Sequence, residues 1–368
     1  MHRHPSGPPP NAALRRGLDF ATRDYLALAS HPALGAAARP AEAQDPAGNE
    51  DDCTTAVPEL QDRLARFVGF PTASCFASGT EAIHHTLLSL LRPEDHVIVD
   101  AGASPALFDA VTTAGAQLHR SPPASVEGIE RRLARLARQS GRGRLVIATT
   151  AVSATTSRVA DLAEISALAR THAATFVVDV SNDLGAMGPS GGGIAEIQSC
   201  NSRIDILLGS FSRTFGATGG FAAFRDPTLS AVQTAAAPLS HANAAVILAA
   251  LHLIAGAEGQ RRRRNLHGLS LRLRNHLMAD GVKVMGKASP FVPILLPPST
   301  ALARTALLQS AGPMVQLLQA PLVPRHAPRW RIQLSAAHGP ADIDDLSELI
   351  RDVTRAFARS PALTSVPA

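Results

Sequence analysis

Lysine is nearly absent from this chain of 368 residues. Only Lys283 and Lys287 are lysines, so the other 33 of the 35 basic residues are arginines. Aromatic residues are also scarce, at 4%, although a nucleic-acid-binding surface usually combines its arginines with aromatic rings. Because alanine is so abundant, we interpret the arginine excess and the net charge of +5 as a genomic compositional bias. We therefore expect no nucleic-acid partner.

Cysteine and long apolar runs are scarce as well. Cys53, Cys75 and Cys200 show no paired spacing, which argues against a disulfide framework or a zinc site and for a reducing compartment. The longest apolar run, at about 244–257, contains His252 and is too short to cross a bilayer. Residues 1–11 lack the apolar segment of a secretory signal. These absences predict a cytoplasmic protein without a metal site or a membrane span.

The chain does have enough apolar sequence for a large core. Hydrophobic residues make up 45% and charged residues 18%, which excludes global disorder. Between residues 72 and 224, short apolar segments alternate with amphipathic helical ones, a pattern typical of βαβ units and a mainly parallel sheet. The predicted strands are 72–77, 96–100, 144–149, 175–179, 205–209 and 220–224, and the predicted helices start near 80, 105, 127 and 161.

The pattern changes near residue 240. A long helix that contains the basic run 261–264 is followed by strand-like segments at 291–296 and 331–334 and by a closing helix at 341–357. This predicts a smaller α/β domain. The expected organisation is an N-terminal arm (1–45), a large cofactor-type domain (46–240), a small C-terminal domain (241–357) and a loose tail (358–368).

Two candidate ligand-binding features follow predicted strands of the large domain. In parallel sheets, ligands gather where the strands end. Ser78, Gly79 and Thr80 stand between a strand and a helix, where free backbone N–H groups suit a phosphate; a simple helix cap is the alternative. Asp179 ends the strand TFVVD, and its carboxylate can hold a cationic ring nitrogen or cap a loop.

Two further features complete the set. Ser210 and Ser212 lie in a loop, 209–220, that is rich in hydroxyls and glycines and could again surround a phosphate. Arg331 lies on a predicted strand of the small domain and suits a bidentate grip on a substrate carboxylate. A structural arginine is the alternative there.

The order of these features resembles pyridoxal phosphate (PLP) enzymes of the aspartate aminotransferase fold. Within that fold the chain resembles the α-oxoamine synthases, a family that includes 8-amino-7-oxononanoate synthase, 2-amino-3-ketobutyrate CoA ligase and serine palmitoyltransferase. The matching segments are 19–28 (family F-x-x-N-D-Y-L-G-L), 60–65 (L-E-x-x-L-A), 179–182 (D-E-A-H), 209–220 (G-T-F-S/T-K followed by glycines) and 329–344 (R-x-R, S-A-A-H-T, D-I-D).

The resemblance covers about residues 15–357 and implies an α/β fold: a PLP fold type I large domain with a mainly parallel sheet, plus a smaller C-terminal α/β domain. It implies a dimer and a decarboxylative condensation of an amino acid with an acyl-CoA or other acyl thioester. It assigns Ser78, Gly79, Thr80, Asp179, Ser210 and Ser212 to the cofactor and Arg23 and Arg331 to the substrate.

The chain departs from the family where its chemistry takes place. The family binds PLP covalently through a lysine, and Arg213 occupies that position. A guanidinium stays protonated, with a pKa above about 12, so it cannot act as an amine nucleophile. Asn182 replaces the D-E-A-H histidine, Arg23 replaces the asparagine of N-D-Y, and residues 102–104 lack the histidine that stacks on the cofactor ring. We therefore expect that the standard synthase activity is lost.

Three functions fit these departures. The first is a non-catalytic homologue that pairs with a lysine-bearing synthase, like the non-catalytic subunit of serine palmitoyltransferase. The second is an active acyltransferase or aminotransferase-like enzyme with PLP held non-covalently; an active protein would be an acyl-CoA C-acyltransferase. The third is a homodimeric ligand-binding scaffold, which needs no cofactor.

Overall fold

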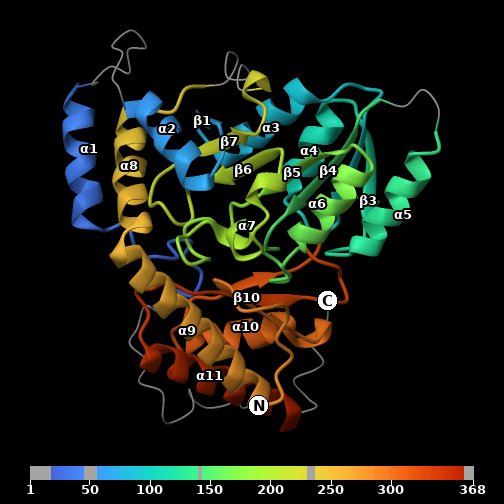
Figure 1. Cartoon of the computed structure of the whole chain (residues 1–368). Coiled ribbons are helices and arrows are strands. Elements are labelled where there is room, and N and C mark those ends of the chain that lie inside the picture. Colours follow the sequence, from blue (N-terminus) through green and yellow to red (C-terminus); the bar gives the residue numbers. More distant parts are fainter. Residues whose placement is uncertain (1–17, 45–55, 140–142, 230–236, 360–368) are drawn as a thin grey trace. The chain divides into compact units, whose positions relative to one another are not determined.

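The computed structural model describes residues 18–44, 56–139, 143–229 and 237–359 (Figure 1). Backbone contacts divide the chain into two compact units. The larger unit comprises Leu26–Ala154 and Arg158–Arg263, and the smaller unit comprises Met1–Tyr25, Thr155–Ser157 and Arg264–Ala368. That the segments 46–240 and 241–357 fold as separate domains stays a prediction.

Strands and helices alternate through the larger unit, as the sequence predicts (Figure 1). In chain order its elements are α1 (Pro32–Gln44), α2 (Ala56–Val68), β1 (Thr72–Phe76), α3 (Gly79–Leu90), β2 (His96–Asp100), α4 (Pro105–Thr113), β3 (Gln117–Ser121), α5 (Val126–Leu136), β4 (Leu145–Thr150), α6 (Leu162–Thr171), β5 (Thr175–Asp179), α7 (Gly193–Ile197), the 3-10 helix η1 (Asn201–Arg203), β6 (Ile206–Ser210), β7 (Gly220–Phe224) and α8 (His241–Ala255).

These strands form one seven-stranded sheet in the order β1-β7-β6-β5-β4-β2-β3. The run from β6 to β3 is parallel, whereas β7 is antiparallel to both of its neighbours. The sheet is therefore mixed and mainly parallel, which confirms the predicted PLP fold type I architecture. Strands β1, β2, β4, β5 and β6 all end at one edge of the sheet, where β7 begins.

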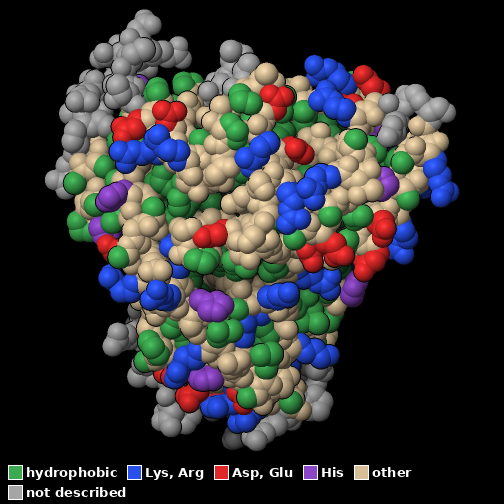
Figure 2. Space-filling model, viewed as in Figure 1, with side chains coloured by type: hydrophobic (Ala, Val, Ile, Leu, Met, Phe, Trp, Pro, Cys, Tyr) green, Lys and Arg blue, Asp and Glu red, His purple; other side chains and the backbone are tan. Residues whose placement is uncertain are grey.

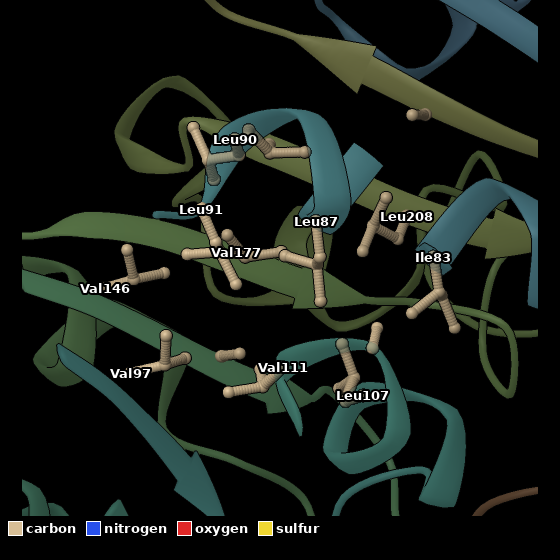
Figure 3. Close-up of a cluster of buried hydrophobic side chains, with 14 of the residues drawn as sticks. Ile83, Leu87, Leu90, Leu91, Val97, Leu107, Val111, Val146, Val177 and Leu208 are labelled. Carbon is tan, nitrogen blue, oxygen red and sulfur yellow. The ribbon is translucent and has the colours of Figure 1, made fainter. Parts of the chain in front are cut away.

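A buried hydrophobic cluster fixes one face of this sheet. Ile83 and Leu87 of α3 and Leu107 of α4 pack on alternate residues of the strands, such as Val97 and Val146 (Figure 3). Alternate strand residues point to the same face, so the intervening residues face the other side, where α5 and α6 pack. Both faces are covered, as expected for βαβ units.

Local sequence explains why α5 forms where it does. Ser125 caps its start, since the Ser125 Oγ accepts a hydrogen bond from Gly128 N at 3.0 Å. Ile129 and Leu133 then recur at helical spacing and are fully buried. The basic residues of the helix lie on its other faces.

The smaller unit carries a second sheet. Its elements are the C-terminal part of α9 (Ala257–Ala279, which begins in the larger unit), β8 (Phe291–Leu295), the 3-10 helix η3 (Pro298–Thr300), α10 (Ala301–Ser310), β9 (Gln316–Leu318), β10 (Arg329–Gln333) and α11 (Pro340–Arg359). The antiparallel order is β8-β10-β9. An N-terminal segment joins it: Gln333 N donates to Phe20 O at 2.7 Å, and Ser335 Oγ donates to Asp24 O at 2.7 Å.

The sequence predicts no disulfide, no membrane span and no metal site, and the described residues bear on each of these expectations. Cys75 and Cys200 are free, buried thiols, whereas Cys53 lies outside the described part of the chain. No single helix in the described ranges is long and apolar enough to cross a membrane; α8 and α9, bent by 73° at their break, reach that length and composition only as a pair. The described residues contain no group of three or more potential metal ligands among His, Cys, Asp and Glu.

Candidate functional site

The start of α3 lies directly against the end of β6. Ser78 caps the helix, since the Ser78 Oγ accepts a hydrogen bond from Glu81 N at 3.1 Å. A Cβ atom added to Gly79 would lie 2.6 Å from the Ser210 Cβ, and one added to Gly220 would lie 2.5 Å from the Gly79 Cα. Only glycine at both positions allows this approach. The N-terminal N–H groups of α3, which lack helical partners, thus lie beside the Ser210 hydroxyl.

The hydroxyl loop after β6 continues this arrangement. Ser210 Oγ and Ser212 Oγ are 2.9 Å apart, and Ser212 N donates to Ser210 Oγ at 3.3 Å. Thr80 and Ser212 are exposed, and Ser78 and Ser210 are half-buried, so solvent can reach the group. A helix N-terminus and two hydroxyls at one place form a suitable site for a phosphate.

Asp179 ends β5 at the same edge of the sheet. Its side chain is 2% exposed, and its Oδ1 accepts a hydrogen bond from Ser181 N at 2.9 Å. Burial raises the pKa of Asp179; hydrogen bonds from Ser181, the charge of Arg213 and a hydrogen bond with Thr150 act in the opposite direction. A cationic ring nitrogen beside this carboxylate would oppose the effect of burial on the pKa and stabilise the charged form of Asp179.

Arg213 lies in the hydroxyl loop, three residues after Ser210. It is half-buried, and its charge acts on Asp179. The larger unit contains no lysine: Lys283 and Lys287 both belong to the smaller unit and are exposed. The basic group of the larger unit whose charge acts on the buried carboxylate is therefore a guanidinium and not an amine.

Asn182 is buried and makes a structural contact. Its Nδ2 donates to the Val152 carbonyl oxygen at 2.7 Å, which ties the segment after β5 to the segment after β4. Its Oδ1 has no hydrogen-bond partner among the described residues. The amide thus presents an unpartnered acceptor in this part of the described chain.

Two residues that the sequence did not single out belong to this region. Thr150 ends β4 next to Asp179, and its Oγ1 accepts a hydrogen bond from Ser104 N at 3.0 Å. Asp183 is fully buried: its Oδ2 accepts a hydrogen bond from Ile194 N at 2.8 Å, and its Oδ1 has no partner among the described residues. Burial, and secondly the charge of Asp179, raise the pKa of Asp183 to about 8. The only signal for Thr150 is its place at a strand end, and Asp183 has none.

The two predicted substrate arginines belong to the smaller unit. Arg23 is exposed in the N-terminal segment. Arg331 lies in β10, is 9% exposed, and its guanidinium donates a hydrogen bond to the Gln316 Oε1. The structure thus groups the predicted phosphate and ring-nitrogen residues in the larger unit, and the two arginines in the other.

These residues match some, but not all, of the requirements of PLP. A phosphate fits the α3 start with Ser210 and Ser212, and a ring nitrogen fits the buried Asp179. Covalent attachment does not fit, because no lysine is present in this unit.

Comparison with known proteins also supports a relation to PLP enzymes. The family model for aminotransferase class I and II matches residues 15–350. The 8-amino-7-oxononanoate synthase of Stutzerimonas stutzeri is 30% identical over 361 residues, which is 95% of this chain and 90% of the relative. That of Anaeromyxobacter dehalogenans is 31% identical over 350 residues, covering 92% of this chain and 86% of the relative.

Solved structures show the same architecture. A serine palmitoyltransferase variant from S. paucimobilis with a bound PLP–myriocin aldimine superposes with a TM-score of 0.85 at 25% identity, covering 92% of this chain and 88% of that one. The Francisella tularensis 8-amino-7-oxononanoate synthase superposes with a TM-score of 0.79 at 19% identity, covering 93% and 98%. The chain therefore belongs to the aminotransferase class I and II family and has the PLP fold type I architecture. Within that family its relatives place it with the α-oxoamine synthases, and they support PLP as the cofactor of the site.

Proposed function

We propose that this chain is a non-catalytic α-oxoamine synthase homologue that binds PLP without a covalent bond and pairs with a lysine-bearing synthase. The observation that carries the proposal is Arg213: a permanently charged group acts on the buried Asp179 carboxylate in a unit that has no lysine. A guanidinium can hold an anion but cannot supply the amine that the family's reaction requires.

The residues of the larger unit would divide the cofactor between them. The α3 N-terminus, Ser210 and Ser212 would hold its phosphate, and Asp179 would hold its ring nitrogen as an ion pair. When bound, PLP supplies an electron-withdrawing ring that stabilises negative charge on an amino acid's α-carbon. Arg213 would keep Asp179 ionised and would attract a carboxylate or phosphate to this edge of the sheet.

Covalent capture tests the role of Arg213. We expect that the parent, mixed with PLP and reduced with borohydride, gains no covalent mass at any lysine, whereas Arg213→Lys gains one PLP mass at position 213. Arg170→Lys is the matched control, because Arg170 is exposed on α6 and the change also adds a single lysine to the larger unit. It should gain none under the same conditions.

A stable adduct of the parent on either native lysine would contradict the proposal. Equal labelling of the two arginine-to-lysine variants would show that any lysine in this unit reacts, and would also contradict it.

The pairing is tested separately. We expect the purified chain alone to show no turnover of amino acids with acyl-CoA, and to co-purify in a defined ratio with a lysine-bearing α-oxoamine synthase when the two are co-expressed. Turnover by the chain alone would instead favour a lysine-independent enzyme. In such an enzyme the α3 N-terminus, Ser210 and Ser212 would bind the cofactor phosphate, and Asp179 would bind the ring nitrogen. If the chain forms a homodimer, does not associate with the synthase and binds ligand without turnover, the result would favour the ligand-binding scaffold.

A further inference from the structure

A second basic site lies away from the candidate cofactor site, on α5. A cavity of about 290 Å³ is lined by Pro122, Gly128, Arg131, Arg132 and Arg135. Gly128, Arg131, Arg132 and Arg135 lie at i, i+3, i+4 and i+7, so they share one face of the helix. The three arginines and the Pro122 ring line the cavity around Gly128.

The close packing of α5 on the end of β3 forms this cavity. A Cβ atom added to Gly128 would lie 2.6 Å from the Pro122 Cδ and 3.0 Å from the Ser125 Oγ. The helix therefore approaches the Pro122 ring more closely than any other residue at position 128 would allow. The position of α5 is fixed, since the side chains of Ile129 and Leu133 pack a neighbouring face of the helix into the core.

Positive charge in this cavity is not neutralised within the described part of the chain. None of the ion pairs there includes Arg131, Arg132 or Arg135. Like charges three and four residues apart on a helix repel each other and destabilise it. Figure 2 shows basic side chains at the edge of the molecule where α5 lies, with acidic ones nearby. A solvated charged face is therefore the alternative to a binding site.

The field of two of these arginines, Arg132 and Arg135, reaches a pair of histidines on the neighbouring strands β2 and β3. His96 Nδ1 and His119 Nε2 are 2.9 Å apart, and their rings stack with centroids 5.2 Å apart. Burial lowers the pKa of His119, and the positive charges of His96, Arg132 and Arg135 lower it further. A bound anion would oppose that effect, so His119 is a built-in reporter of anion binding.

We propose that the α5 cavity binds a small phosphate-class anion through Arg131, Arg132 and Arg135. Arginine is suited to this role because its planar guanidinium donates paired hydrogen bonds to phosphate oxygens. The volume is at the lower end for ligand pockets and suits a phosphate or pyrophosphate group rather than a whole cofactor. The anion is either free or part of a larger phosphorylated ligand, and the test separates these sources.

Calorimetric titration of the full chain with inorganic pyrophosphate is the primary test. We expect saturable binding that Arg132→Gln/Arg135→Gln weakens at least about tenfold. The control variant, Arg66→Gln/Arg170→Gln, removes two exposed arginines from α2 and α6 and therefore has the same net charge. It should bind like the parent, and circular dichroism should show that both variants are folded.

The histidine signal locates the binding. We expect pyrophosphate to raise the pKa of His119 in the parent, followed by NMR of the imidazole carbons, and to leave it unchanged in the α5 variant. Pyrophosphate bound at the start of α3 would not move this signal, so the α5 site can fail while the proposed PLP site stands, or the reverse.

Coenzyme A provides the second arm. If the α5 variant weakens coenzyme A and pyrophosphate by the same factor and the two compete, the cavity serves the phosphates of a larger ligand. If only pyrophosphate responds, the ligand is a free phosphate. No binding by the parent, equal weakening in both double variants, or an unmoved His119 signal would mean an adventitious ion only and would overturn the proposal.

Discussion

The side chain of Asp183 packs against the glycine-rich loop 185–193. The loop can approach the carboxyl group because Gly193 has no side chain: a Cβ atom there would lie 2.4 Å from the Asp183 Oδ2. Ile194 N satisfies this one oxygen and leaves the other unpartnered among the described residues. A buried carboxyl group with a single donor favours its neutral form.

This carboxyl group should make stability depend on pH. Between the ordinary pKa of 3.8 and about 8, the unfolded chain releases the proton while the folded chain keeps it. The free energy of unfolding therefore falls as pH rises through this window, by up to ~1.4 kcal/mol per pH unit. We expect Asp183→Asn, which cannot titrate, to flatten this fall in urea denaturation measured across the window.

Asp109→Asn is the control for that measurement, because Asp109 is exposed on α4 and its removal should leave the pH slope unchanged. If the Asp183 variant kept the slope of the parent, the group would be ionised in the folded state.

Prediction at this scale succeeds where chemistry follows from position in the chain. Ser78, Asp179 and Ser210 follow or end apolar runs, so they could be expected at one edge of a parallel sheet. Asp183 could not be found in this way, because its burial depends on how the loop 185–193 folds back over it. The contact of Asn182 with Val152 likewise joins two loops that are 30 residues apart.

Among the elements, β7 and α3 depend on each other through Gly220. A Cβ atom at Gly220 would lie 2.5 Å from both the Gly79 Cα and the Ser78 carbonyl oxygen, which are backbone atoms that cannot rotate away. We expect Gly220→Ala to lower the free energy of unfolding by roughly 1–3 kcal/mol and to weaken PLP binding, because the α3 start must move away from Ser210. Denaturant unfolding and a PLP titration measure the two effects.

The matched control is Gly268→Ala, in the interior of α9. Nothing lies within 4 Å of an added Cβ atom there, so the helix should gain roughly 0.5–1 kcal/mol. If both variants were equally stable, the close approach at Gly220 would not be a constraint.

The strands β3 and β9, which the sequence did not predict, have little apolar signal. β3 has the sequence QLHRS, and only its last residue is buried, because it is an edge strand of the sheet. β9 has only three residues. The spatial order of the strands, with β7 between β1 and β6, also does not follow from the order of apolar runs along the chain.

At the scale of the whole molecule, the segment around Phe20 near the N-terminus packs in the same unit as the C-terminal part of the chain. Phe20 is fully buried in the smaller unit, with its ring centroid 4.5 Å from that of His338, and its carbonyl oxygen accepts a hydrogen bond from Gln333 N. We expect Phe20→Ala to lower the stability of the smaller unit by about 3–5 kcal/mol. Hydrogen exchange should show the loss of protection in β8 and β10.

Leu302→Ala serves as the control, since Leu302 is 67% exposed on α10 and its truncation should change protection little. Uniform loss of protection in both units of the Phe20 variant would show that they unfold together.

The overall fold was largely predictable, because α/β alternation and the family motifs extend over most of the chain. The division into units was less so. Residues 18–25 and Thr155–Ser157 belong with the C-terminal part through long-range contacts that no local pattern reveals, such as the Ser157 Oγ donating to the Lys287 carbonyl oxygen at 2.7 Å.

The reversal of direction at β7 has an evolutionary consequence. Both ends of the loop 211–219 are held in place, because Ser210 at the end of β6 pairs with Gly220 at the start of β7. The scaffold around position 213 is thus set by strand pairing and glycine contacts rather than by the side chain at that position. A lineage could therefore exchange an amine for a guanidinium in one step, and lose or alter a reaction, while the backbone of this loop and the Ser210 hydroxyl stayed in place.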